Sequence, residues 1–70
     1  MTNDTEIIEL VEGAALARKE PKIPRDFITE ALERVNSGKE IVERYPTGAP
    51  SLKGVYNIAS RLYKESTASR

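Results

Sequence analysis

The chain has 70 residues and contains no cysteine, no histidine and no tryptophan. Without cysteine it forms no disulfide, and without cysteine or histidine it lacks the usual ligands of structural zinc. Acid–base or nucleophilic chemistry would fall to carboxylates, lysine, serine or tyrosine. A carboxylate-only magnesium or calcium site stays open, but no segment has EF-hand spacing. We therefore expect that the protein is not an enzyme and that it has no catalytic residues, no metal and no cofactor.

Long hydrophobic runs are also missing. No apolar stretch reaches the roughly 18 residues of a membrane span, and no basic segment leads into an apolar one at the N-terminus. The eleven basic and eleven acidic side chains cancel, so the chain as a whole does not attract nucleic acid or anionic lipid. These features predict a soluble cytoplasmic protein without a membrane partner.

The short chain predicts a single domain with a small core. A chain of this length buries only about 60% of the surface that its unfolded form exposes. Small cores of this kind usually need a disulfide, a metal or a second chain for support. Since the sequence has no cysteine for a disulfide and no cysteine or histidine for a structural zinc, we expect association with another protein or with itself, as a homodimer.

Charge is unevenly distributed along the sequence. The net charge is −4 over residues 1–16, +3 over 17–25, −2 over 26–45 and +3 over 46–70. The first of these segments overlaps a predicted helix over residues 4–19, in which Gly13 is unfavourable. We interpret Gly13 as a point where another helix comes close. A stiff connector with two prolines, Pro21 and Pro24, follows.

The longest apolar stripe lies between Pro24 and Tyr45. Helical spacing puts a set of apolar side chains on one side: Phe27, Ile28, Ala31, Leu32, Val35, Val42 and Tyr45. The sequence Asn36-Ser37-Gly38 leaves two alternatives. Either the helix runs through, or it ends with Gly38 as a left-handed cap and Lys39–Tyr45 forms a separate short helix. We favour the break.

A last helix is predicted from Leu52 to about Glu65. The segment Pro46–Pro50, with two prolines and a glycine, interrupts regular structure, and Ser51 is a good N-cap. Residues 66–70 are expected to be a disordered tail. The sequence thus predicts one all-α domain over residues 1–65, a compact bundle of three helices, or four if the central one breaks near Gly38.

Two surfaces are candidates for binding. The first lies on the central helix and the turn after Tyr45, and a tyrosine beside a rigid turn suits a protein contact. An inhibitor, adaptor or regulator would use these residues: Glu40, Arg44, Tyr45 and Tyr56. The alternative is that the tyrosines only cover the edge of the core, with their hydroxyls in water.

The second candidate surface is the polar side of the last helix. Asparagine and arginine can read bases, and lysines can reach phosphates. A nucleic-acid-binding transcriptional regulator would use these residues: Lys53, Asn57, Arg61 and Lys64. However, a helix-turn-helix has a turn of about three or four residues, and here two prolines lie within five. The simpler interpretation is a solvated outer face.

Overall fold

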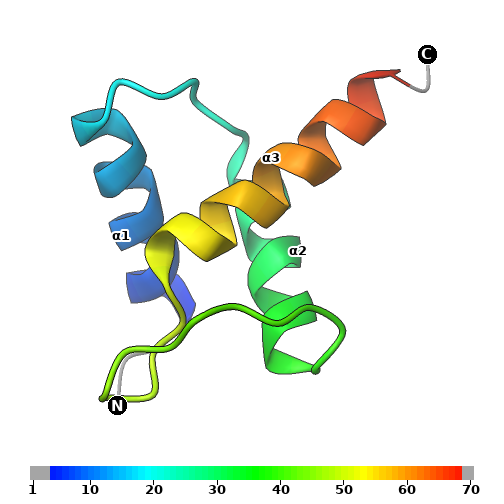
Figure 1. The fold of residues 1–70 in the computed structure, drawn as a ribbon. Helices are drawn as coiled ribbons and strands as arrows, with labels where there is room; N and C mark the ends of the chain where they lie inside the picture. Colours follow the sequence, from blue (N-terminus) through cyan, green and yellow to red (C-terminus); the bar gives the residue numbers. More distant parts are fainter. Residues whose placement is uncertain (1–3, 69–70) are drawn as a thin grey trace.

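The structure is a computed structural model that describes residues 4–68. In this part of the chain there are three helices, α1 (Asp4–Ala17), α2 (Arg25–Asn36) and α3 (Leu52–Ala68). The predicted all-α bundle is confirmed. As Figure 1 shows, α3 lies across the other two helices, with its start near α1 and its end beyond α2. A connector, residues 18–24, joins α1 to α2, and a longer loop, residues 37–51, joins α2 to α3.

The central helix ends at the predicted break. Gly38 has a left-handed φ of 81°, and its N–H donates to the Val35 carbonyl. The N–H of Lys39 donates to the Arg34 carbonyl at 2.9 Å. These two bonds form a Schellman motif, which satisfies the last carbonyls of the helix. The alternative of a helix that continues through Asn36-Ser37-Gly38 is wrong.

The separate short helix predicted for Lys39–Tyr45 is also wrong. This segment leads into a small hairpin, in which the Tyr45 N–H donates to the Ala49 carbonyl and the Ser51 N–H to the Glu43 carbonyl. A seven-residue helix forms too few internal hydrogen bonds to offset its nucleation cost. The hairpin bonds replace them.

Helix α1 stops two residues before its predicted end. Lys19 adopts a left-handed φ of 57°, and the Glu20 N–H donates to the Ala15 carbonyl. This is again a Schellman motif, here with lysine in the position that usually holds glycine. The motif turns the chain away from the helix axis, so α1 ends at Ala17, before Pro21.

The close approach predicted at Gly13 occurs instead at Gly54. A Cβ atom added to Gly54 would lie 2.9 Å from both Cβ and Cγ1 of Val42, in the loop. A Cβ added to Gly13 would meet nothing within 4 Å. The interpretation of Gly13 is therefore wrong within the monomer, and the first turn of α3 needs glycine because the loop packs on it.

Helix α3 starts as predicted and extends further than predicted. The Ser51 hydroxyl accepts a hydrogen bond from the Gly54 N–H at 3.3 Å, as an N-cap does. The helix continues through residues 66–68, where the Thr67 hydroxyl donates to the Lys64 carbonyl. The prediction of disorder is therefore wrong for these three residues. Residues 69 and 70 of the predicted tail, and residues 1–3 of the predicted domain, lie outside the described residues.

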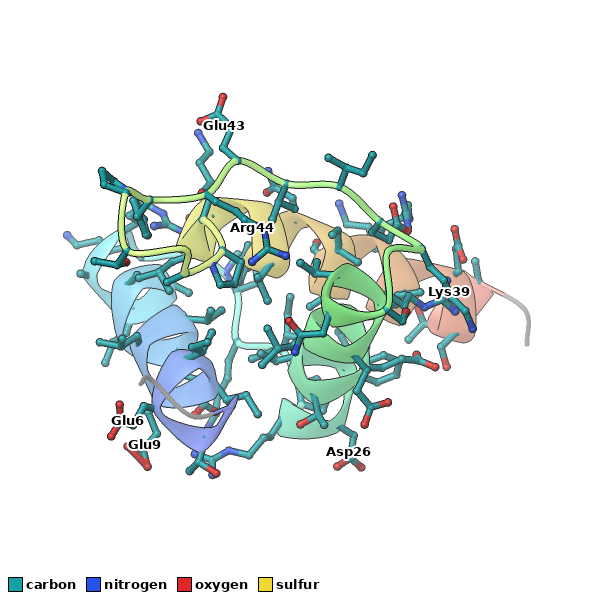
Figure 2. All side chains as sticks on the ribbon, turned by 90° about the horizontal axis from the view of Figure 1, so that it is seen from below. Glu6, Glu9, Asp26, Lys39, Glu43 and Arg44 are labelled. Atoms are coloured by element: carbon teal, nitrogen blue, oxygen red, sulfur yellow. The ribbon has the colours of Figure 1, made fainter. Side chains whose placement is uncertain are left out.

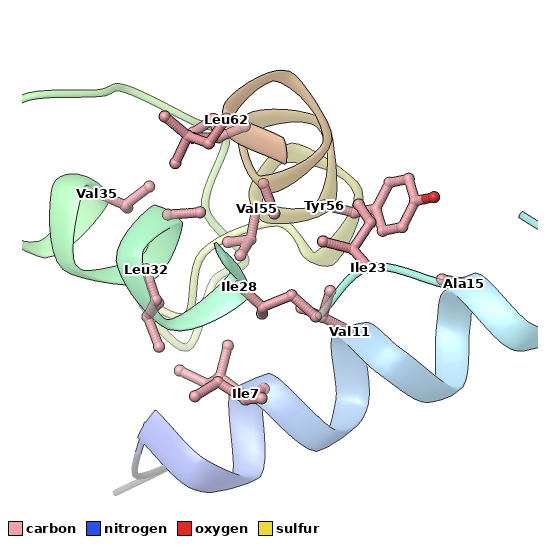
Figure 3. Close-up of a cluster of buried hydrophobic side chains, with 14 residues drawn as sticks. Ile7, Val11, Ala15, Ile23, Ile28, Leu32, Val35, Val55, Tyr56 and Leu62 are labelled. Atoms are coloured by element: carbon pink, nitrogen blue, oxygen red, sulfur yellow. The ribbon is translucent and has the colours of Figure 1, made fainter. Parts of the chain in front are cut away.

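One hydrophobic core joins the three helices (Figure 3). The apolar stripe of α2 is covered by α1 and α3, with Ile28 only 2% and Leu32 only 1% exposed. Among the described residues, no buried side-chain nitrogen or oxygen lacks a hydrogen-bond partner. The stripe therefore needs no second chain to cover it. The buried side chains are Ile7, Ile8, Val11, Ala15, Ile23, Ile28, Ala31, Leu32, Val35, Val55, Tyr56, Ile58, Ala59 and Leu62.

Candidate functional site

The structure separates the four residues predicted to bind protein. Glu40, Arg44 and Tyr45 all lie in the loop between α2 and α3. Tyr56 is a core residue that is 5% exposed, and its hydroxyl donates to the Pro21 carbonyl at 2.7 Å. This hydrogen bond ties α3 to the connector after α1, so Tyr56 does not share a surface with Tyr45.

The loop is held in place at several points. Glu40 forms an ion pair with Arg61 of α3. The Arg44 guanidinium donates through Nη1 to the Gly48 carbonyl at 2.8 Å, across the hairpin. Val42 packs against the core from the loop side. A surface ion pair contributes only about 0–1 kcal/mol, so the packing of Val42 is the stronger of these attachments.

Two apolar side chains of the loop face solvent. Ile41 is 94% exposed and Tyr45 is 48% exposed, whereas Val42 between them is half-buried. We call Ile41 and Tyr45 together the loop surface. In Figure 2 the loop runs along α3 and Glu43 points outward from it. The sequence did not single out Ile41, because a helix was predicted for Lys39–Tyr45 and Ile41 is not among the apolar residues at helical spacing. In an extended chain, the side chains of consecutive residues such as Ile41 and Val42 point to opposite sides.

The residues predicted to bind nucleic acid lie on α3. Lys53, Asn57 and Lys64 are exposed. Arg61 is also accessible, but its guanidinium pairs with Glu40 and lies 3.9 Å from a carboxylate oxygen of Glu65. These carboxylates lower the positive potential that phosphate binding requires, and this disfavours a nucleic-acid interface.

A cavity of about 280 Å³ lies between α1, the connector and α3. Its lining is mainly apolar, and the side chains include Ala15, Leu16, Ile23, Ile28 and Tyr56. The carboxylates nearby are engaged: Glu12 accepts a hydrogen bond from Arg25 at 2.7 Å, and Glu20 pairs with Arg18. Across residues 4–68, no group of three or more acidic side chains is placed to hold a metal ion. The cavity is therefore an apolar recess whose neighbouring carboxylates Glu12 and Glu20 are already paired.

We expect Tyr56 to make the free energy of unfolding depend on pH in the alkaline range. Burial raises the pKa of its phenol, and the Glu20 carboxylate raises this pKa further. Arg18, whose Cζ atom lies 5.9 Å from the centre of the ring, lowers it. The unfolded chain ionises at the ordinary pKa of 10.0, while the folded protein still holds its proton. The free energy of unfolding therefore falls as the pH rises above about 10, because the unfolded state then binds fewer protons.

The variant Tyr56→Phe tests this effect. At neutral pH it should lose about 0.5–1.5 kcal/mol of stability, because the hydrogen bond to Pro21 is missing. Between about pH 9 and pH 11 its stability should fall less steeply than that of the wild type. Urea unfolding at a series of pH values measures both quantities. Parallel curves for the two proteins would show that Tyr56 does not carry the pH dependence.

Comparison of the chain with protein-family models, curated proteins and solved structures found no match. No helix within residues 4–68 combines the length and apolar character needed to cross a membrane. Function is therefore inferred from the exposed side chains and from the contacts that hold them in place.

Proposed function

We propose that this protein is a non-enzymatic interaction module that binds another protein through the loop surface. The observation that carries this proposal is the 94% exposure of Ile41 in a loop anchored on both sides. Burying an isoleucine side chain contributes about 1.5–3 kcal/mol. Because the loop is already held by the Glu40–Arg61 ion pair, the hairpin and Val42, little conformational entropy is lost on binding.

The surroundings of Ile41 suit a small contact with an apolar centre. Tyr45 adds aromatic area on the same loop, and the exposed charged residues Glu43 and Arg44 lie between Ile41 and Tyr45 in the sequence. Interfaces commonly place such a centre inside a polar rim. The partner would offer an apolar recess for Ile41. In this proposal Glu40 positions the loop through Arg61, and α2 contributes support, since its own apolar face is buried.

The variant Ile41→Asp should lose binding. We expect its affinity for the partner to fall about 10- to 100-fold, since a charged group replaces the buried anchor. The wild type, immobilised and exposed to an extract of its native host, would first identify the partner, and calorimetry with the purified partner would then compare the variants. Thr67→Asp is the control, because it introduces the same charge at an exposed position near the end of α3, outside both the loop surface and α1.

Two results would contradict the proposal. One is a partner bound equally well by the wild type and by Ile41→Asp. The other is retention of nucleic acid, weakened steeply by salt and lost in the double variant Arg61→Ala with Lys64→Ala. That second result would support the polar face of α3 as the binding surface.

A further inference from the structure

The outer face of α1 carries two exposed leucines. Leu10 is 53% and Leu16 is 79% exposed, and Gly13 lies midway between them. Residues spaced by three share one side of a helix. The opposite side of α1 is the one that enters the core, through residues such as Ile7 and Val11. We call Leu10, Gly13 and Leu16 the α1 outer face.

Gly13 lines the cavity beside α1, but no contact within the monomer requires glycine at this position. Glycine is among the least favourable residues in a helix interior. A Cβ atom added there would meet nothing within 4 Å, so no neighbouring atom in the chain excludes one. A glycine between two exposed leucines instead leaves room for the backbone of a second helix to come close.

The charges beside this face identify the orientation of that helix. The first turns of α1 carry Glu6 and Glu9, which point away from α2 and α3 in Figure 2. The C-terminal end of the helix is followed by Lys19, which is exposed, and by Arg18, whose guanidinium pairs with Glu20. An antiparallel second copy would place acidic ends against basic ends, whereas a parallel copy would place like charges together.

We infer that the α1 outer face binds the same face of a second copy of this chain, antiparallel, with the two helices crossing at Gly13. The twofold axis places Leu10 of one copy opposite Leu16 of the other, at the rim of the cavity beside α1. α1 has 14 residues, about 21 Å, so the contact is small and the dimer depends on concentration. This inference does not rest on the loop surface.

The variant Gly13→Gln tests the crossing point. Glutamine favours helix and has open space at this position, so the monomer should unfold at a higher temperature. Its side chain also blocks close approach, so the dissociation constant of the dimer should rise at least about tenfold. Sedimentation equilibrium from about 1 µM to about 1 mM covers the expected range. Ile41→Asp, altered only on the loop surface, should dimerise like the wild type.

A concentration-dependent dimer that Gly13→Gln weakens would support the inference. A wild type that remains monomeric at every concentration overturns the inference, as does Gly13→Gln with an unchanged dissociation constant. Neither result bears on the loop surface, whose binding is measured with Ile41→Asp.

Disulfide trapping tests the orientation, because the natural chain has no cysteine to interfere. Under mild oxidation, an equimolar mixture of Leu10→Cys and Leu16→Cys should form cross-linked dimers that contain one of each variant. Either variant alone should cross-link far less. Efficient cross-linking of each variant alone would instead show a parallel pair and overturn the proposed arrangement.

Discussion

Replacing Leu32 with alanine should lower the free energy of unfolding by about 2–5 kcal/mol. Leu32 lies in α2 and is 1% exposed, within the core shared by the three helices. The loss combines the removed apolar surface with the cavity that remains, which rigid neighbours fill only in part. A domain of this length has a total stability of roughly 4–10 kcal/mol, so the substitution should remove from about a fifth of it to all of it.

Urea or thermal unfolding followed by circular dichroism measures this loss. Ile41→Ala is the matched control, since Ile41 is an aliphatic residue of equal size that is 94% exposed. Its stability should stay within about 0.5 kcal/mol of the wild type. Equal losses in the two variants would show that Leu32 does not lie in a closely packed core.

Adding a single methyl group at Gly54 should detach the loop from α3. In Gly54→Ala the new Cβ would lie 2.9 Å from Cβ and Cγ1 of Val42, which is closer than real carbon contacts allow. Val42 Cβ is next to the backbone, so relief requires movement of the loop itself. Overpacking of this kind costs about 1–3 kcal/mol, more than the gain in helix propensity near a helix start.

A second substitution separates this clash from other effects. Val42→Gly removes both atoms that would lie 2.9 Å from the new methyl group, so the double variant with Gly54→Ala should show a favourable coupling of at least about 0.5 kcal/mol. Unfolding experiments on the two single variants and the double variant give the coupling. Additive losses would show that the loop packs on α3 elsewhere than at Gly54.

Much of the fold could be predicted because its signals are local. The apolar spacing of α2 and α3, the cap at Ser51 and the left-handed glycine at Gly38 each depend on a few neighbouring residues. The end of α1 was harder, because a lysine occupies its left-handed position. The residue type alone does not predict this, because a left-handed backbone conformation is unfavourable for lysine. Here two backbone hydrogen bonds, from the N–H groups of Lys19 and Glu20, stabilise that conformation.

The loop between α2 and α3 could not be predicted for a different reason. Its conformation depends on partners distant in the sequence, such as Arg61 for Glu40 and Gly54 for Val42. Tyr56 illustrates the same limit, because its hydroxyl bonds to Pro21, 35 residues earlier. Of the residues predicted to bind protein, those in the loop stayed together, and the core tyrosine did not.

The three tyrosines lie in three different environments. Tyr56 is buried beside the connector, Tyr45 is half-exposed in the loop, and the Tyr63 ring lies 5.2 Å from the ring of Phe27, between α3 and α2. With no tryptophan in the chain, these phenols dominate its near-ultraviolet absorption. Because the three phenols absorb in the same band, single tyrosine-to-phenylalanine variants would assign the near-ultraviolet changes that accompany loosening of the loop and parting of α2 from α3, without an added label.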